Sequence, residues 1–384
     1  MKKRKFYLFF MVIILFLVPF FLGEFFCRLR YKHIDLWEIT GRKPTSQANE
    51  WGVTDAFSAF KFKAGYVYKD RKLYKTVNNF GFISTPNLTV TKPDKTIRIV
   101  FLGESATAGT GYNLSDKDTW PWQAIQLIKK ELPRLNIDFI NGAVGGYTSF
   151  ESYGRLWSRI RFFNPDIICV YHGWNEMYYF TKGKIDNIVH WRENRDGSWD
   201  FNEPEYTKII QPLFVDYFIR YSQLLTKLRL KLSKLHTGEI NSEKKEQLLS
   251  KEYDKRGLEV FRKNLKLIKM TSELIGAKLF VCKQATLIVS GLASEQQRCR
   301  YNYHGFDHEA HIDAFNNIYR IIEEEIDADS IIDVTPISGT PEYFNDHIHP
   351  TKQGSSKIAE IVSKKIIQWI ESNHEHLKLD SKGY

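Results

Sequence analysis

The sequence predicts an α/β fold built on a parallel sheet and preceded by an N-terminal transmembrane helix. Three observations lead to this prediction. From residue 96 onward, short β-branched and apolar runs alternate with helix-length segments, which is typical of βαβ units with parallel strands. An uncharged apolar run lies near the N-terminus. Polar clusters follow several predicted strands, at the edge where a parallel sheet binds its ligands.

The predicted strands and helices follow one another regularly. The first strand, 96–102, lies between Lys95 and Gly103, and its continuous apolar character indicates burial. Further strands are predicted at 137–140, 166–171, 277–282 and 331–334, and helices at 120–132, 150–163, 258–275, 309–325 and 351–370. The hydrophobic fraction of 43% fits a folded chain rather than a disordered one.

The N-terminal segment begins with four basic residues, Lys2 to Lys5, and continues without charge from Phe6 to Gly23. Such a run is just long enough, at ~18 to 20 residues, to span a bilayer. The basic residues before it favour a cytoplasmic N-terminus. We therefore expect a single-pass membrane protein with an uncleaved signal anchor and with the rest of the chain on the extracytoplasmic side. A cleaved signal peptide and a buried hydrophobic segment are the alternatives, although no small-residue cleavage site lies near the end of the run.

The chain is divided accordingly into four parts: 1–32 (basic end and anchor), 33–95 (stalk and lead-in), 96–371 (α/β domain, with an insertion at about 177–257) and 372–384 (polar tail). The insertion contains a predicted amphipathic helix over 213–235, whose leucines and tyrosines share one face. This pattern is typical of ordinary packing, and a membrane-surface or lid element is the alternative.

The net charge of +10 is unevenly distributed along the chain. Between Arg220 and Lys269 there are 14 Lys and Arg against 6 Asp and Glu, and both flanks of the apolar run are basic. A basic face on a membrane-tethered protein suits anionic headgroups or solvent better than nucleic acid, so we expect no nucleic-acid partner. Four cysteines in a chain of this length do not predict a disulfide framework.

Four polar clusters fall at the predicted carboxyl edge: 103–105, 141–148, 172–176 and 345–350. A serine hydroxyl such as that of Ser105 becomes a good nucleophile when an imidazole accepts its proton. We expect His349 rather than His347 to be this base, because Asp346 stands three residues before it and can hold its ring by accepting from Nδ1. The oxyanion formed from an ester needs donors, and the Ser105 amide, a glycine amide and the Asn175 side chain are candidates.

These four blocks resemble those of the SGNH, or GDSL-type, hydrolase superfamily. Gly103-Glu104-Ser105 matches the first block, Asn141 to Thr148 the second, Gly173 to Glu176 the third and Asp346 to His349 the last. The resemblance spans about 96–371 and implies a flavodoxin-like three-layer α/β/α fold. It implies ester hydrolysis, or less often acyl transfer, without a metal or organic cofactor. The catalytic residues it implies are Ser105, Asp346, His349, Gly146 and Asn175.

Two features depart from the family pattern. Glu104 stands where the family usually has Asp, which puts a supporting hydrogen bond beside the nucleophile in doubt. Gly145 adjoins Gly146, so either glycine can supply the oxyanion donor. Separately, His304, His308 and His311 form a cluster, but the Cys/His pattern of a zinc site is missing. We therefore expect no metal site.

The sequence thus predicts a membrane-anchored serine esterase that acts on an ester-bearing extracytoplasmic glycan or lipid. An O-acyltransferase acting on surface polysaccharide is one alternative. A catalytically idle SGNH-like module that binds glycan or lipid is the other. The complete set of serine, glycine, asparagine, aspartate and histidine argues against the idle module, because a binding module needs no activated nucleophile.

Overall fold

The computed structural model describes residues 2–30, 52–70, 73–110, 114–180, 191–193, 199–201, 213–236, 249–291, 299 and 301–379. The chain divides into two compact units. The smaller unit comprises Met1–Asn49 with Asn202–Glu246, and the larger comprises Glu50–Phe201 with Gln247–Tyr384. The predicted boundaries at residues 33, 96 and 372 stay predictions.

The larger unit is built on a five-stranded sheet, in the order β11-β10-β7-β5-β6. Its strands are β5 (Thr96–Gly103), β6 (Asn136–Asn141), β7 (Ile167–His172), β10 (Lys278–Lys283) and β11 (Ile331–Asp333). All neighbouring strands are parallel. Counted along the chain, the order is 2-1-3-4-5, which is that of flavodoxin-like folds. The predicted parallel α/β sheet is confirmed.

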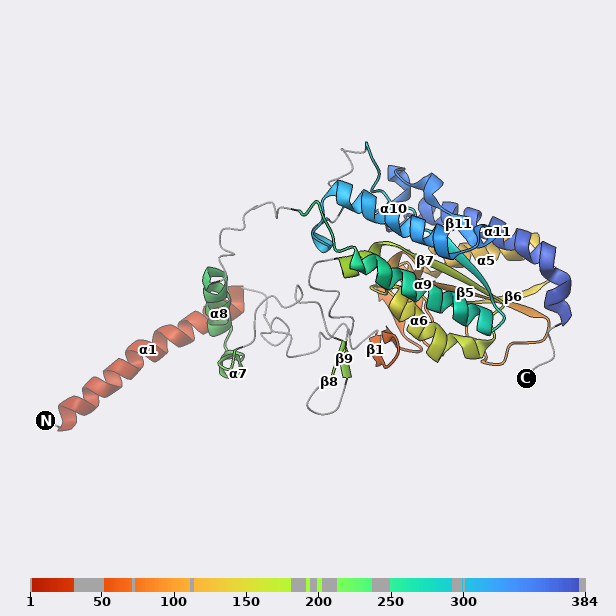
Figure 1. Cartoon of the computed structure of the whole chain (residues 1–384). Coiled ribbons are helices and arrows are strands. Elements are labelled where there is room, and N and C mark those ends of the chain that lie inside the picture. Colours follow the sequence, from red (N-terminus) through yellow and green to blue (C-terminus); the bar gives the residue numbers. More distant parts are fainter. Residues whose placement is uncertain are drawn as a thin grey trace. The chain divides into compact units, whose positions relative to one another are not determined.

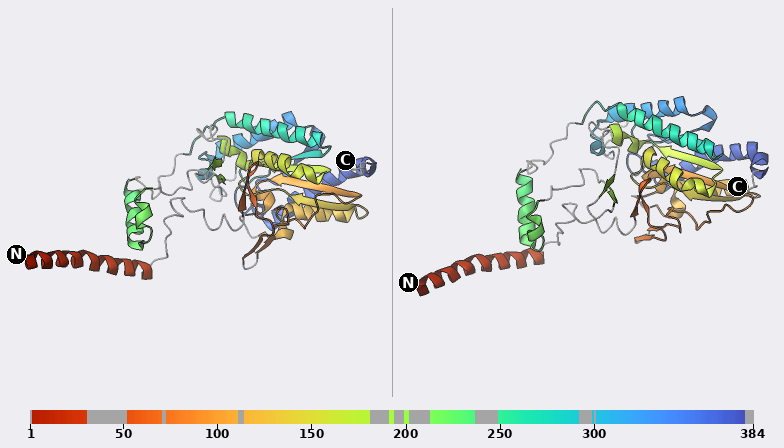
Figure 2. Two further views of the ribbon diagram at one scale, coloured as in Figure 1. Left: turned by 90° about the horizontal axis from the view of Figure 1, so that it is seen from below. Right: turned by 60° about the horizontal axis from the view of Figure 1, so that its bottom comes forward.

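Helices cover both faces of this sheet (Figures 1 and 2). They are α5 (Trp120–Glu131), α6 (Ser149–Ser158), α9 (Arg256–Leu274), α10 (His308–Glu325) and α11 (Lys352–Leu379). α5 packs against α11 on one face, and α9 packs against α6 and α10 on the other. The helix predicted at 150–163 stops at Ser158 and is followed by a 3-10 turn over Ile160–Phe163. The last helix runs to Leu379, past its predicted end at residue 370.

The core lies between the central strands and these helices. Every residue of β7 is buried, and β5 is buried from Ile97 to its end. A strand covered by helices on both faces has no solvent side, which explains why these strands read as continuous apolar runs rather than as alternating ones. On one face the Trp120 ring packs against Phe101 and Tyr171, with ring centroids 5.2 and 5.4 Å away.

The lead-in to the sheet is part of the larger unit and packs against its helix α6. It contains the antiparallel pairs β1 (Gly52–Asp55) with β2 (Ala59–Phe62) and β3 (Val67–Asp70) with β4 (Leu73–Thr76). The buried Arg155 guanidinium donates to the Gly81 carbonyl at 2.6 Å. A Cβ on Gly154 would lie 1.8 Å from the Phe57 carbonyl oxygen. Glycine at 154 therefore allows this close approach.

The insertion contributes two further strands to the larger unit. β8 (Trp191–Glu193) and β9 (Trp199–Phe201) pair antiparallel.

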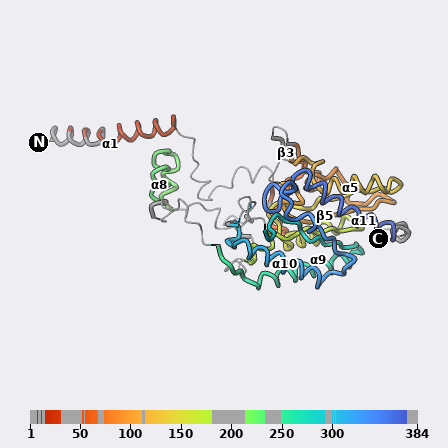
Figure 3. Tube along the Cα trace, turned by 90° about the horizontal axis from the view of Figure 1, so that it is seen from above, coloured from red at the N-terminus to blue at the C-terminus, as the bar shows by residue number. Residues whose placement is uncertain are grey.

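The smaller unit contains α1 (Lys2–Arg30), α7 (Asp216–Ile219) and α8 (Gln223–His236). The prediction of one amphipathic helix over 213–235 is wrong, because the helix breaks between Ile219 and Gln223. The break has a local cause, since the Ser222 hydroxyl accepts from the Leu225 amide at 3.1 Å and so caps a new helix. α8 lies beside the C-terminal end of α1 (Figure 3).

The predicted membrane anchor, Phe6 to Gly23, lies within α1. Over the part of the chain that the structure describes, no helix reaches the length and apolar character needed to cross a membrane. The anchor therefore stays a prediction.

Candidate active site

Ser105 stands where β5 ends and the short helix α4 (Ser105–Ala108) begins. The turn before it is tight, because a Cβ on Gly103 would lie 2.3 Å from Thr107 Oγ1 and 2.8 Å from the Tyr171 carbonyl oxygen. Glycine is therefore required at this position. The Ser105 side chain is half-buried at the carboxyl edge of the sheet.

The structure brings Ser105, His349 and Asp346 together. His349 Nε2 lies 2.8 Å from Ser105 Oγ. On the other side of the ring, His349 Nδ1 lies 2.9 Å from both carboxylate oxygens of Asp346. The three side chains are hydrogen-bonded in series, although 244 positions separate the serine from the histidine.

The loop that carries Asp346 and His349 is held by its own hydrogen bonds. Asp346 is buried, and its Oδ1 also accepts from the backbone amides of Ile348 and His349, both at 3.0 Å. The His347 carbonyl accepts from the Leu287 amide at 2.8 Å and from the Thr286 hydroxyl at 2.9 Å. These contacts fix the direction of the carboxylate and with it the orientation of the imidazole.

Two of the three expected oxyanion donors, Gly146 and Asn175, lie on neighbouring loops. Asn175 lies in the 3-10 segment Trp174–Phe180 that follows β7, and its Nδ2 donates one hydrogen bond to the Tyr147 carbonyl at 2.9 Å. Gly146 has a φ of +88°, in the left-handed region that favours glycine. A Cβ on Gly145 would lie 3.6 Å from Ser105 Cβ, whereas one on Gly146 would meet Phe60. Gly145 is thus the glycine nearer to the serine side chain.

Glu104 has the supporting hydrogen bonds that the sequence left in doubt. Its Oε2 accepts from the Asn175 amide at 2.9 Å, and its Oε1 accepts from Gln284 Nε2. Gln284 Oε1 in turn accepts from the Trp174 amide at 2.7 Å. Burial raises the pKa of Glu104 to about 7, although the bonds from Gln284, Asn175 and Trp174 act to lower it. Glu104 and Gln284 together fix the start of the Asn175 loop.

Sequence reasoning missed Gln284. The available signal was its position, because it is the first residue after β10, at the same carboxyl edge as the other polar clusters. The polar clusters after the other strands were recognised because they match family motifs. A single glutamine after a strand matches no such motif.

A second buried carboxyl lies beside this loop. Burial raises the pKa of Glu176 to about 8, and Ser149 donates to it from its amide at 2.6 Å and from its hydroxyl at 2.9 Å. His172 Nδ1 lies 3.5 Å from Glu176 Oε1, and burial lowers the pKa of His172 to about 3. Burial thus favours the neutral form of both side chains.

The histidine cluster of the sequence takes part in packing and hydrogen bonding. His308 contacts the Tyr301 hydroxyl at 2.6 Å and the Val289 carbonyl at 3.0 Å. His304 Nδ1 lies 3.3 Å from His311 Nε2, and the Trp174 ring packs against both imidazoles. These contacts connect the cluster to the loop that carries Asn175.

Among the described residues, the donor atoms of Asp346, His347 and His349 lie within 4.8 Å of one another, close enough to be considered for a metal ion. Both ring nitrogens of His349 are already hydrogen-bonded, to Ser105 and to Asp346. This geometry favours proton transfer by His349 over metal ligation.

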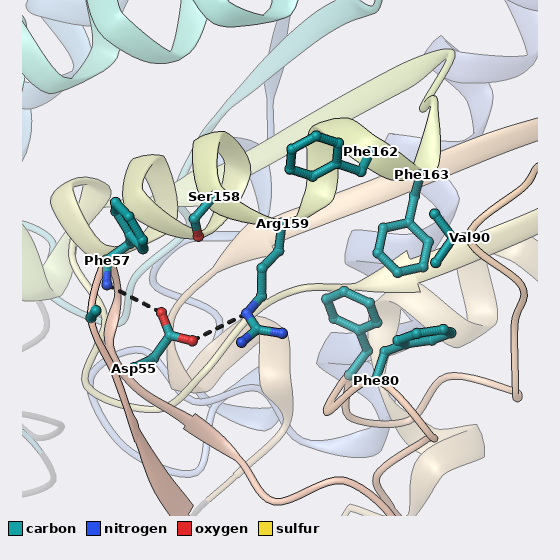
Figure 4. Close-up of a pocket in the computed structure, with 10 residues that line it drawn as sticks. Asp55, Phe57, Phe80, Val90, Ser158, Arg159, Phe162 and Phe163 are labelled. Atoms are coloured by element: carbon teal, nitrogen blue, oxygen red, sulfur yellow. Dashed lines mark hydrogen bonds and ion pairs between the residues drawn. The ribbon is translucent and has the colours of Figure 1, made fainter.

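An aromatic hollow of about 480 Å³ lies between the lead-in and the end of α6. Figure 4 shows the residues that line it. Its apolar walls include Phe80, Phe162 and Phe163. At its rim Asp55 accepts from the Phe57 amide at 3.2 Å and from Arg159 Nε at 3.1 Å. None of the residues lining this hollow belongs to the serine, histidine and aspartate arrangement.

A serine, a histidine and an aspartate hydrogen-bonded in series at the carboxyl edge of a parallel sheet are the arrangement found in serine hydrolases. A family model described as GDSL-like Lipase/Acylhydrolase matches residues 99–362. The chain belongs to this family and is an ester-cleaving hydrolase. No curated protein matches the chain.

Solved structures similar to this chain include three esterases or lipases. The acetylxylan esterase Axe2 from Geobacillus stearothermophilus is 10% identical, with 70% of this chain and 94% of that chain covered and a TM-score of 0.39. The lipase Lip_vut3 from a goat rumen metagenome is 14% identical, with 70% and 97% covered and a TM-score of 0.41. The acetyl xylan esterase AlAXEase is 13% identical, with 70% and 100% covered and a TM-score of 0.39.

Proposed function

We propose that this hydrolase is a membrane-anchored serine esterase in which Ser105 is the nucleophile, His349 the general base and Asp346 the group that orients the base. The observation that carries the proposal is the continuous hydrogen-bonded series from Ser105 Oγ to His349, at 2.8 Å, and from His349 to Asp346, at 2.9 Å. Both distances lie within the range over which a positioned base can accept a proton.

The reaction proceeds in two halves. Ser105 Oγ bonds to the ester carbonyl carbon as its proton passes to His349 Nε2, and the ester C–O bond then breaks as His349 gives this proton to the leaving alcohol. A water molecule next attacks the acyl-serine, losing a proton to His349, and the bond to Ser105 Oγ breaks as the serine recovers a proton. Asp346 accepts from Nδ1–H throughout and stabilises the imidazolium.

We assign the oxyanion hole to the amides of Ser105 and Gly146 and to the Asn175 side chain. Asn175 Nδ2 carries two hydrogens, and its bond to the Tyr147 carbonyl uses one of them. The second is then available to the developing negative charge. Gly145, whose Cβ position is the nearer to Ser105, is the alternative glycine.

We further propose that Phe6 to Gly23 is an uncleaved membrane anchor and that the substrate is an ester-bearing glycan or lipid outside the cytoplasm. Four successive residues of α1, Leu15 to Val18, are all exposed. Successive helical residues point about 100° apart, so four of them cover the full circumference. Over these four residues α1 is apolar on every side, which suits a lipid environment.

Topology is tested by fractionating the full-length protein. We expect it to stay with membranes after carbonate extraction and to be digested by external protease in intact cells or spheroplasts. Digestion that appears only after lysis would place the catalytic domain in the cytoplasm and overturn the proposed orientation and substrate class.

Chemistry is tested with the detergent-solubilised full chain. A fluorophosphonate probe should label Ser105, and a series of chromogenic esters from acetyl to long acyl should be hydrolysed. The Ser105→Ala variant is the matched control for both measurements. Labelling without hydrolysis, but with transfer of the acyl group to a polysaccharide acceptor, would identify an acyltransferase, and absence of both would indicate an idle binding module.

A further inference from the structure

The segment from Leu213 to Leu232, here called the α7–α8 segment, exposes an unusual amount of apolar surface. Phe214, Phe218 and Tyr221 are 81%, 63% and 70% exposed, respectively. The other exposed apolar side chains of the segment are Leu213, Val215, Tyr217, Leu228 and Leu232. Soluble monomers rarely expose a contiguous apolar patch of this kind unless it meets a partner or a membrane.

Hydrogen bonds tie this segment to α1 at a defined position. Glu24 Oε1 accepts from the Gln223 amide at 3.0 Å, and Glu24 Oε2 accepts from the Leu224 amide at 2.9 Å and the Ser222 hydroxyl at 2.8 Å. Glu24 thus satisfies amides at the N-terminus of α8 that have no partner within the helix. Arg28 Nη2 also donates to the Tyr221 carbonyl at 2.8 Å.

The hydrogen bonds between α8 and Glu24 lie at the end of the uncharged run, because Glu24 directly follows Gly23. If Phe6 to Gly23 occupies the hydrocarbon core, Glu24 lies at its boundary, at the level of the headgroups. The start of α8 is then held at that same level.

The charge and length of the segment fit this level. Between residues 213 and 232 there are four basic residues, Arg220, Lys227, Arg229 and Lys231, against one acidic residue, Asp216. A basic segment is attracted to anionic headgroups by ~1 kcal/mol per Lys or Arg near the surface. With 14 residues, α8 is about 21 Å long, which is shorter than the ~30 Å hydrocarbon core. The segment is therefore suited to lie in the plane of the interface rather than to cross it.

We propose that the α7–α8 segment is an interfacial element that inserts Phe214, Phe218 and Tyr221 into the headgroup layer of an anionic bilayer, at the level set by Glu24. This inference rests on the proposed anchor. It assigns to part of the insertion a role in membrane contact that is separate from the chemistry at Ser105.

The test uses the full chain in lipid nanodiscs and follows hydrogen exchange over residues 213–232. We expect exchange to be slower, on the order of tenfold, when phosphatidylglycerol replaces part of the phosphatidylcholine. The double variant Phe214→Ser with Phe218→Ser should lose this protection while its ester hydrolysis is unchanged. The matched control, Phe162→Ser with Leu274→Ser, removes exposed apolar side chains of the larger unit and should keep the protection.

Equal exchange in the two lipids would overturn the inference. Protection that appears in detergent and rises with protein concentration would also overturn it, because it would show a second copy of the chain covering the patch. Carbonate extraction is run on the same protein. If carbonate releases the protein from membranes, both the proposed anchor and this inference are wrong. If the protein is retained but its hydrogen exchange is equal in the two lipids, only the interfacial contact is wrong.

Discussion

The larger unit buries a group of polar side chains, whereas the smaller unit exposes a group of apolar ones. In the larger unit the polar groups next to Ser105 are buried, and the Glu104 carboxylate accepts hydrogen bonds from the Asn175 amide and the Gln284 side chain. In the smaller unit α1 and the α7–α8 segment leave apolar side chains exposed, and hydrogen bonds of Glu24 and Arg28 join them. The first unit contains the environment that its side chains need. The exposed apolar side chains of the second unit are not covered within that unit, and the bilayer that we propose is an environment that would cover them.

This difference leads to separable outcomes for substitutions. Changes around Ser105 should alter chemistry and leave membrane contact intact, and changes around Glu24 should do the reverse. A substitution that altered both properties would break the comparison.

The largest effect is expected at the nucleophile and its base. Ser105→Ala or His349→Ala should lower ester turnover by a factor of about a thousand or more, because proton transfer and acyl-serine formation are lost. Turnover is measured with a chromogenic ester, and thermal unfolding and carbonate extraction serve as controls for fold and anchoring. Near-normal turnover in either folded variant would reject the assignment.

The next largest effect is expected at the oxyanion hole. Asn175→Ala should lower kcat by roughly 10² to 10³, since one donor to the developing charge is removed. Steady-state kinetics with one ester distinguish this role from simple binding. A rise in KM at unchanged kcat would make Asn175 a residue that binds the ground state.

A smaller effect is expected in the pH dependence of stability. The pKa of Glu176 is raised to about 8 and that of Glu104 to about 7, so each carboxyl favours folding in its protonated form. The native state then binds more protons than the unfolded state, and stability falls as pH rises from 4.5 toward 8. The neutral His172, with a pKa of about 3, has the opposite effect, but only below pH 6.5.

The window from pH 6.5 to 8 therefore reports mainly the glutamates, because burial lowers the pKa of Lys75 to about 8 and this group opposes them only near the upper end of the window. Between these values the protein should lose about 1 to 2 kcal/mol through Glu176, and Glu176→Gln should remove that part of the loss. Chemical denaturation at several pH values measures it. An unchanged slope in the variant would show that Glu176 is ionised in the native state throughout this range.

The smallest effect is expected at Glu24. Glu24→Ala should destabilise α8 by about 1 kcal/mol, the usual loss when a helix loses its capping side chain. Hydrogen exchange of the α8 amides should accelerate about fivefold, while ester turnover should stay the same. Glu259→Ala, at an exposed glutamate on α9, is the control. Unaltered exchange at α8 would mean that Glu24 does not hold the helix.

The sheet and the approach of Ser105, Asp346 and His349 could be predicted because their signals are local. Each strand is a short apolar run, and a parallel sheet brings the residues after its strands to one edge. The Asp-x-x-His spacing likewise placed Asp346 beside His349, as the distance of 2.9 Å reflects. None of these inferences required knowledge of contacts distant in sequence.

The parts that could not be predicted depend on such distant contacts. Glu104 is hydrogen-bonded to Gln284, which is 180 positions away in the sequence. No local sequence pattern predicts this pair. The helix predicted over 213–235 matched an apolar period of 3.6, but period alone does not detect a serine that caps from within the pattern, as Ser222 does. Nor does an amphipathic period say whether its apolar face meets a protein core or a membrane.

The packing of the lead-in decides how the larger unit can be dissected. Although the recognisable family blocks begin with β5, Arg155 depends on the carbonyl of Gly81, and the Phe82 ring is part of the hydrophobic core. A recombinant fragment that begins at residue 96 would remove the carbonyl that accepts from the buried Arg155 guanidinium and would remove the Phe82 ring from the core. The minimal unit for expression and crystallisation therefore includes Gly81 and Phe82 and does not start where the sequence motifs start.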